Sequence, residues 1–348
     1  MAGAAADGGR VFIARRRSAA ERAPGRISGA RELPLGPGAG QQTEPGCSPE
    51  AGIAARRLRH LSPAATARKL VRSEPFVSSS TKTLLELRGR SVAGLETCIE
   101  VPSLKLLLDV GSCSRSAVNH RRVLISHGHL DHIGAIAQHA ARRSLLGMEE
   151  GEYFVPSEIA SQVEALFNAA GALDGQVIPR RIVPLSPGRD EPLGKRRTLR
   201  PFRTFHRVPS QGYTVWETRS RLRAEFRGMP GEELGALRRR GVEVAEAHEV
   251  PLLSFTGDTR VEVLEQTPEL QQTECLVIEA SFLDERVPVA QARDMGHIHL
   301  DELVDRHELL PKTDVVLSHF SSRYTTEEVT LLLKRKLPAE RFAQARAL

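Results

Sequence analysis

Three histidines and one aspartate gather within six residues of this 348-residue chain, in the segment His127-Gly-His-Leu-Asp-His132. The apolar run 123–126 precedes the segment and predicts a strand, and an amphipathic pattern follows it and predicts a helix. His127 and His129 are two residues apart, so at an extended strand end their side chains project in the same direction. Imidazoles and a carboxylate this close together are costly to bury without a cation, so the segment predicts a site for a divalent metal.

Further polar residues stand at or near the ends of other apolar runs, and they are Asp109, His206, Asp258 and His319. Together with the segment 127–132, and in this chain order, they resemble the metallo-β-lactamase superfamily over roughly residues 81–330. The resemblance implies an α/β (α+β) fold of the αββα sandwich type. In that fold the strand ends bring the ligands to one edge of two packed sheets.

Four shorter segments narrow the resemblance, and they are Pro209-Ser-Gln-Gly-Tyr213, Gly257-Asp-Thr259, Gly296-His297 and Ser321-Ser-Arg-Tyr324. They are similar to the short form of ribonuclease Z, the endonuclease that removes 3′ trailers from precursor tRNA. The resemblance implies a zinc-dependent phosphodiesterase that acts on RNA through metal-activated hydroxide. It also implies a homodimer, which is the usual assembly of the family. No membrane partner is expected.

The resemblance assigns seven metal ligands to two zinc ions per chain. One ion is expected on His127, His129 and His206, the second on Asp131, His132 and His319, with Asp258 bridging both. Asp109 is expected to organise the ligand loop and not to touch metal.

Three catalytic roles follow from the same resemblance. Asp131 is expected to orient or deprotonate the attacking water. His297 is expected to protonate the departing 3′ oxygen, and Gly296 before it would let this loop approach the substrate closely. Arg323 is expected to hold a phosphate oxygen, since a guanidinium offers phosphate a planar fork, and its alternative is a structural ion pair.

The second histidine of the motif bears on the identity of the metal. Diiron members of the superfamily carry glutamate where this chain has His129, so zinc is the better expectation. Two other functions stay open. One is a binuclear zinc hydrolase of the same fold that acts on a small ester, a thioester or a cyclic nucleotide. The other is a non-catalytic scaffold that binds RNA or protein, although such scaffolds usually lose ligands.

The segment 217–250 departs from the family pattern. Ribonuclease Z usually carries a Gly- and Lys-rich arm after its His206-type motif, which clamps the tRNA elbow. Here the segment is short and lacks that glycine-rich pattern, although it is basic early and at Arg238–Arg240. Either the arm is abbreviated or tRNA is not the substrate, and a solvated charged helix with a connecting loop is the plain alternative.

The expected elements form one large domain over residues 81–348 with a mixed sheet core. Early strands are expected at 84–87, 98–101, 104–110 and 123–126, and they are expected to be antiparallel because no helix intervenes. Helices are expected at 133–146, 156–170, 300–310 and 325–337, and buried strands at 276–278 and 315–317.

Residues 1–80 have a different composition, and they hold the basic excess of the chain. They carry 13 of the 49 Lys and Arg but only 6 of the 43 Asp and Glu, while the net charge of the whole chain is +6. The body is therefore nearly neutral, and its global charge gives no argument for nucleic-acid binding. An Arg-rich, Ser-bearing and acid-poor leader is typical of an organelle transit peptide.

For this leader we expect an organelle, the chloroplast rather than the mitochondrion. A disordered tail on a cytoplasmic or nuclear protein is the alternative. No apolar run approaches the length of a transmembrane helix, and the four cysteines lack CxxC spacing, so a disulfide framework and a thiolate zinc site are excluded.

Overall fold

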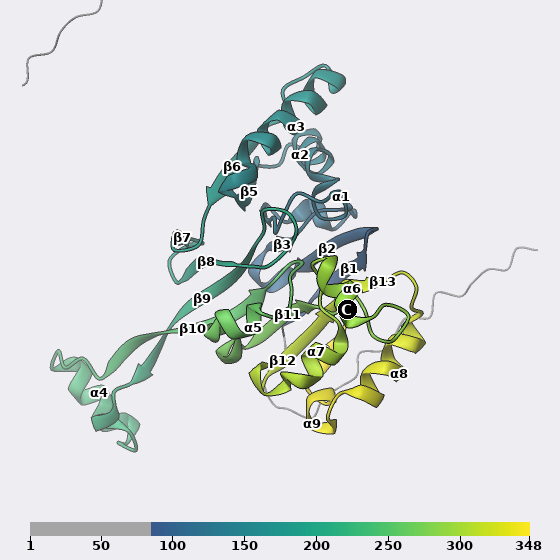
Figure 1. Ribbon diagram of the computed structural model, residues 1–348. Coiled ribbons are helices and arrows are strands. Elements are labelled where there is room, and N and C mark those ends of the chain that lie inside the picture. The colour runs from purple at the N-terminus through teal and green to yellow at the C-terminus, as the bar shows by residue number, and fades with distance from the viewer. Residues whose placement is uncertain (1–84) are drawn as a thin grey trace, which may run out of the picture. The chain divides into compact units, whose positions relative to one another are not determined.

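The computed structural model describes residues 85–348, so the expected leader and Leu84 lie outside the described residues. Within this part of the chain, a first seven-stranded sheet has the order β13-β1-β2-β3-β4-β5-β6 (Figure 1). Its strands are β1 (Arg88–Ala93), β2 (Glu96–Val101), β3 (Leu106–Leu108), β4 (Arg122–Leu124), β5 (Gly151–Pro156), β6 (Arg180–Leu185) and β13 (Phe320–Ser321).

A second seven-stranded sheet has the order β14-β12-β11-β10-β9-β8-β7. Its strands are β7 (Glu191–Pro192), β8 (Arg197–Arg203), β9 (Gln211–Leu222), β10 (Ala245–Phe255), β11 (Cys275–Glu279), β12 (Asp314–Ser318) and β14 (Ala345–Ala347). Both sheets mix parallel and antiparallel pairs.

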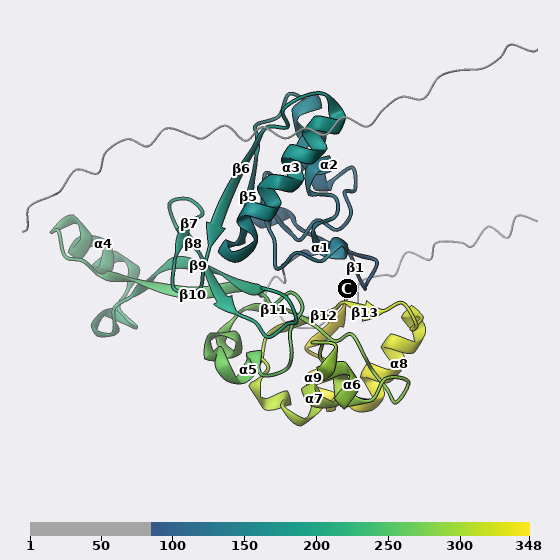
Figure 2. The ribbon, with the colours of Figure 1, turned by 45° about the horizontal axis from the view of Figure 1, so that its top comes forward.

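Helices cover the outer face of each sheet (Figures 1 and 2). They are α1 (Leu130–Ile133), α2 (Ile136–Leu145), α3 (Ala160–Asp174), α5 (Val263–Gln266), α6 (Val289–Asp294), α7 (Leu300–Asp305), α8 (Thr326–Lys336) and α9 (Ala339–Phe342). A further helix, α4 (Gly231–Arg239), lies at the far end of strands β9 and β10 and covers neither sheet. Among the described residues, none of these helices is both long and apolar enough to cross a bilayer.

Three apolar clusters fill the layers between these elements. Leu108, Val215 and Val277 belong to the cluster that both sheets share. Phe167 belongs to the cluster under α2 and α3, and Leu332 to the one under α7 and α8. The order helix, sheet, sheet, helix confirms the expected αββα sandwich.

The early strands differ from the expectation in two ways. The strand expected at 84–87 is wrong: β1 begins at Arg88, while Leu85 and Leu87 pack against the inter-sheet core, so their apolar character reflects burial and not pairing. The first two pairs are antiparallel as expected, but β3 and β4 are parallel. The connection between β3 and β4 is long enough to cross over, which an antiparallel hairpin does not need.

The helix boundaries also shift. The helix expected at 133–146 begins at Ile136 as α2, after the separate short helix α1, and the one expected at 156–170 starts at Ala160. The helix expected at 300–310 ends at Asp305 and continues as a separate 3₁₀ turn. The expectation at 325–337 is confirmed by α8, where the Thr325 side chain caps the first turn through the Glu328 N–H.

Tyr213 ties the two sheets together near the ligand-bearing loops. Its hydroxyl is buried and lies 2.7 Å from the Ile125 carbonyl oxygen and 3.1 Å from the Phe154 carbonyl oxygen, which belong to the first sheet or its strand ends. The hydroxyl donates to these carbonyls from β9 of the second sheet. This contact holds the end of β4, which leads into His127, against the start of β9, which follows His206.

Strands β9 and β10 form a long hairpin that extends away from the sandwich (Figures 1 and 2). Their pairing runs without a break from Val250↔Glu217 to Ala245↔Leu222, and α4 lies beyond the last pair. We call residues 217–250 the arm. Its cross-strand ion pairs include Arg221–Glu246 at 2.8 Å and Arg223–Glu243 at 3.1 Å, which support a projecting two-stranded ribbon.

Candidate metal centre

The histidine motif is held by Asp109, which follows β3. Its carboxylate accepts hydrogen bonds from the Ser126 N–H, the Ser126 hydroxyl and Nδ1 of His132, each at 2.7 Å. Asp109 is fully buried and has a φ of 54°, a conformation that non-glycine residues rarely adopt. The geometry agrees with the expected role for Asp109, because its two oxygens orient the loop and do not join the ligand groups.

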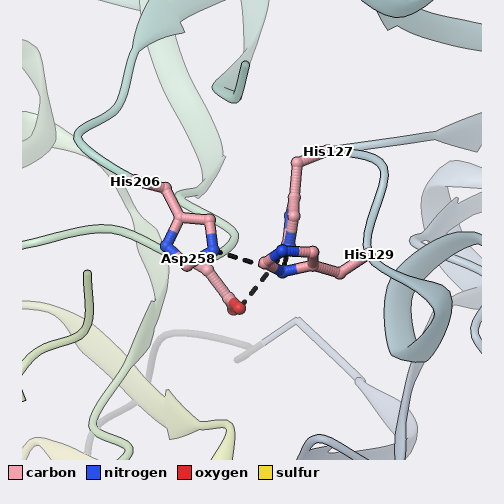
Figure 3. A group of neighbouring side chains, drawn as sticks. All are labelled: His127, His129, His206 and Asp258. Carbon is pink, nitrogen blue, oxygen red and sulfur yellow. Dashed lines mark hydrogen bonds and ion pairs between the residues drawn. The ribbon is translucent and has the colours of Figure 1, made fainter. Parts of the chain in front are cut away.

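The first ligand group is His127, His129, His206 and Asp258, whose side chains point toward one another (Figure 3). Nδ1 of His129 lies 3.0 Å from Nε2 of His127 and 3.3 Å from Nε2 of His206. Asp258 Oδ2 lies 3.6 Å from Nε2 of His127. Two ligands of a tetrahedral zinc with bonds of about 2.0–2.1 Å stand roughly 3.3 Å apart, so these separations suit one ion.

The second ligand group is Asp131, His132 and His319. Nε2 of His132 lies 3.2 Å from Nε2 of His319, and Asp131 Oδ2 lies 3.7 Å and 3.6 Å from these two nitrogens. The backbone N–H of Gly94, in the β1–β2 turn, donates to Asp131 Oδ2 at 2.8 Å and fixes this carboxylate. Gly94 has a φ of 72°, which the tight turn needs and glycine tolerates.

Asp258 lies between the two groups. Its Oδ2 is 3.6 Å from Nε2 of His127 and 3.3 Å from Nε2 of His132, and its Oδ1 is 3.4 Å from Nδ1 of His319. Oδ1 is also buried without a hydrogen-bond partner among the described residues. A buried carboxylate oxygen without a donor is a position that a cation satisfies.

Hydrogen bonds on the far side of the rings decide which nitrogens face the centre. The Ser126 hydroxyl donates to Asp109 and so accepts from Nδ1 of His127 at 3.0 Å; Nδ1 of His206 donates to the Gly296 carbonyl oxygen at 2.8 Å. His132 likewise donates from Nδ1 to Asp109.

In the neutral rings the opposite nitrogens, all Nε2, are therefore acceptors that converge on one space. Several converging acceptors repel one another unless a cation sits among them, so the residues present fit a metal. An imidazole-rich set with carboxylates suits zinc.

Asp258 keeps its negative charge at the centre of the two ligand groups. Burial alone would raise the pKa of Asp258, but the imidazoles of His132 and His319 outweigh it and hold the pKa well below its usual range. Burial lowers the pKa of His127. At His132 burial also acts to lower the pKa, yet Asp258 and Asp109 outweigh it and raise the pKa well above its usual range. Metal ligands must lose their protons, so a divalent cation would compete with the proton that these groups share.

His297 stands beside the ligand groups and is held from behind by Glu279. Nδ1 of His297 donates to the two Glu279 oxygens at 3.1 Å and 3.2 Å, and lies 3.9 Å from Asp258 Oδ2. Burial would lower the pKa of His297, but the Glu279 carboxylate outweighs it and raises the pKa to about 9. The imidazole therefore carries a proton at neutral pH, as a general acid must.

The loop at Gly296 orients the ring of His206 through a hydrogen bond. With a φ of 81°, Gly296 brings its carbonyl oxygen to Nδ1 of His206, and a Cβ on this residue would stand only 2.8 Å from that nitrogen. Glycine is needed here for close approach to a ligand. An approach of this loop to the substrate stays a prediction.

The segment after His319 forms hydrogen bonds with the loop at residues 283–284. Tyr324 donates from its hydroxyl to Asp284 at 3.1 Å and accepts from the Leu283 N–H at 2.9 Å. Arg323 is exposed, and no described contact joins its side chain to the ligand groups. Its phosphate-binding role therefore stays a prediction.

Two residues of the site escaped the sequence analysis. Glu279 is buried at the end of β11 and accepts from the Ser281 hydroxyl, the Thr259 N–H and His297. A carboxylate directly after the apolar run 275–278 was the available signal, since β11 is parallel to β12 and both ends lie at one edge. Arg207, next to His206, is exposed, and its positive charge contributes to lowering the pKa of His129.

Comparisons with known proteins agree with this arrangement. Residues 114–320 match the family model of the β-lactamase superfamily domain. The chain is 37% identical over 245 residues to tRNase Z TRZ1 of Arabidopsis thaliana, which covers 70% of this chain and 88% of that protein. It is 33% identical over 259 residues to the chloroplastic tRNase Z TRZ2 of the same plant, which covers 73% of each.

A solved structure shows the same fold. The metallo-β-lactamase fold protein YhfI from Bacillus subtilis superposes with a TM-score of 0.52 and 14% sequence identity. The match covers 74% of this chain and 92% of that one. At this identity the likeness concerns the fold alone.

Proposed function

The chain belongs to the ribonuclease Z family within the metallo-β-lactamase superfamily, and we propose that it removes 3′ trailers from precursor tRNA. It is a hydrolytic endoribonuclease of that family. The observation that carries the proposal is the pair of histidine and aspartate groups around Asp258, because such a centre suits the anionic phosphodiester of RNA.

We assign one zinc ion to His127, His129 and His206 and a second to Asp131, His132 and His319, with Asp258 between them. The separations of 3.0–3.7 Å within the two groups support this division. When bound, two zinc ions supply a water of lowered pKa and positive charge for the phosphodiester. Asp131 orients the attacking water, and His297 gives its proton to the departing 3′ oxygen.

Replacing Asp131 with alanine is expected to abolish hydrolysis while the fold is retained. Asp131 lies at the edge of the second ligand group, and among residues 85–348 the Gly94 N–H is the one backbone group that binds its side chain. Circular dichroism and thermal unfolding of the metal-free variant check the fold, and cleavage of bis-p-nitrophenyl phosphate checks the chemistry. Activity near that of the wild type would show that Asp131 has neither role.

The arm supports an RNA substrate. The sequence left open whether this segment was an abbreviated arm or an ordinary charged helix, and the structure has a projecting hairpin that ends in α4 (Figure 1). Arg238–Arg240 are exposed at the C-terminal end of α4, while its acidic residues stand in the first turn. We propose that these arginines contact RNA phosphates, which position a nucleic acid without reading its sequence.

Joining Leu222 to Ala245 through an Asn-Gly turn would remove the tip of the arm, because these residues are directly paired. The shortened protein is expected to cleave precursor tRNA with a KM raised roughly tenfold or more, since each lost phosphate contact weakens RNA binding. Hydrolysis of bis-p-nitrophenyl phosphate should not change. An unaltered KM for precursor tRNA would remove the arm from the substrate-binding surface.

The proposed function is tested by incubating the full chain with a 3′-extended precursor tRNA, with and without a chelator. We expect one cut that releases the 3′ trailer, loss of cutting with chelator and recovery with zinc. Cleavage of a small ester, thioester or cyclic nucleotide without cleavage of the RNA would favour the other hydrolase. Metal analysis should give about two zinc ions per chain, and sedimentation should give the proposed homodimer.

We propose that residues 1–80 direct the protein to an organelle, and the chloroplast is the first candidate. The composition of the leader supports import, and one of the relatives is named chloroplastic. Fusion of residues 1–80 to a fluorescent reporter is expected to give an organellar signal, because an Arg-rich, Ser-bearing and acid-poor leader has the composition of a transit peptide. A diffuse cytosolic or nuclear signal would leave the leader without this role.

A further inference from the structure

A groove outside the metal centre lies where the β7–β8 turn meets β9. It has a volume of about 670 Å³, and half of its lining residues are basic: Lys195, Arg196, Arg197 and Arg219. Glu217 is the acidic residue of the lining, and Leu193, Gly194 and Ser220 complete it. Four cationic groups therefore face one carboxylate. Glu274 also binds Arg219, at 2.9 Å, and even when it is counted the groove keeps a net positive charge.

The cations of the groove differ in how well they are neutralised. Arg197 and Arg219 both bind Glu217, at 3.1 Å and 2.9 Å. Lys195 and Arg196 are exposed, and among residues 85–348 neither has a carboxylate in an ion pair. The groove thus combines two arginines that are ion-paired with two cations that still have donors to offer an anion.

The turn holds these two cations in place. Leu193 is buried, and its N–H donates to the Arg197 carbonyl oxygen at 2.9 Å, which closes the β7–β8 turn around residues 194–196. Gly194 has a φ of 129°, a conformation that other residues adopt only with strain. The Arg196 carbonyl accepts from the Thr218 N–H at 2.8 Å, and Arg196 Nε donates to the Thr218 carbonyl oxygen at 3.1 Å. The terminal nitrogens of this guanidinium stay available.

The groove lies between the metal centre and the tip of the arm along β9. Ser210, just before β9, pairs with His127 of the metal centre, and Thr218 binds Arg196. Eight residues of strand separate the two positions, which is about 26 Å at roughly 3.3 Å per residue.

We propose that this groove binds the phosphodiester backbone of the RNA substrate, at a site distinct from both the scissile phosphate and the arm tip. The proposal rests on the proposed function, because it needs a substrate long enough to reach the groove and the metal centre together. Arg196 offers a planar fork to a phosphate, and Lys195 adds a compact charge beside it. Contacts of this kind position a nucleic acid and carry no sequence preference.

The test is the double charge reversal Lys195→Glu with Arg196→Glu, with Lys334→Glu and Arg335→Glu as the matched control on an exposed part of α8. Binding of a 3′-extended precursor tRNA is measured at several salt concentrations in the presence of zinc and with inactivated Asp131→Ala chains. The groove variant should weaken binding and lower the slope of log K against log salt by about two, or roughly one per lost phosphate contact. When the groove substitutions are made in the chain with Asp131 intact, KM for this RNA should rise and kcat should stay unchanged.

Further outcomes separate this proposal from the function on which it rests. If the wild-type chain does not cleave precursor tRNA, the proposed function fails. If it does, and the groove variant matches the α8 control in salt slope and KM, the groove is not an RNA site. Hydrolysis of bis-p-nitrophenyl phosphate should equal that of the wild type, since this diester is too small to reach the groove. The milder Lys195→Gln with Arg196→Gln should show a smaller effect in the same direction, and no effect would overturn the proposal.

Discussion

Replacing Asp258 with alanine is expected to abolish hydrolysis of both precursor tRNA and bis-p-nitrophenyl phosphate and to lower the zinc content of the chain. The Asp258 carboxylate lies within 3.3–3.6 Å of nitrogens in both ligand groups, so the substitution removes a contact from each. It also removes the buried carboxylate that lies between the imidazoles of the two groups. A loss of at least about 10³-fold in kcat follows if the centre supplies several kcal/mol to the transition state.

Three measurements check the Asp258 variant. Metal analysis should give clearly fewer than two zinc ions per chain, and added zinc should raise the melting temperature of the variant less than that of the wild type. Asp174→Ala, on the exposed end of α3, is the matched control and should behave as the wild type does. Full zinc content with substantial activity in Asp258→Ala would contradict a carboxylate shared between two ions.

The parts of the fold that depend on local pattern were predictable from sequence. The apolar runs at 276–278 and 315–317 are strands β11 and β12, and the capping residue Thr325 marks the start of α8. Pairing direction was not predictable in the same way. The runs at 104–110 and 123–126 look alike whether their strands are parallel or antiparallel, and only the path of the chain between them decides.

The metal centre was more predictable than its surroundings. Each proposed ligand follows an apolar run, and strands with parallel neighbours end at the same edge, so sequence order carried spatial information. Glu279 obeys the same rule and was overlooked because a single glutamate carries no motif. The position of the arm was visible in the sequence, but its conformation stayed open. Its ribbon depends on pairs such as Arg221 with Glu246, which are far apart in sequence and show no pattern of their own.

Replacing His297 with alanine is expected to lower kcat on precursor tRNA by about 10²–10⁴-fold, the range typical of a lost general acid. The departing 3′ oxygen of RNA is a poor leaving group and needs a proton. Glu279 holds the ring through Nδ1 and raises the pKa of His297 to about 9, so Nε2 carries a proton at neutral pH. A p-nitrophenolate group leaves without protonation, and hydrolysis of bis-p-nitrophenyl phosphate should therefore fall far less.

Zinc content separates this role from a ligand role, which the geometry also allows because His297 lies within reach of Asp258 and His319. We expect His297→Ala to retain its zinc, and Glu279→Gln to lose part of the activity on RNA by weakening the hold on the ring. His307→Ala is the matched control, since Nδ1 of His307 donates to the Val304 carbonyl oxygen in a 3₁₀ turn, away from the ligand groups. If His297→Ala loses zinc, or slows both substrates equally, His297 is a ligand or a structural residue, and the leaving-group proton comes from another donor.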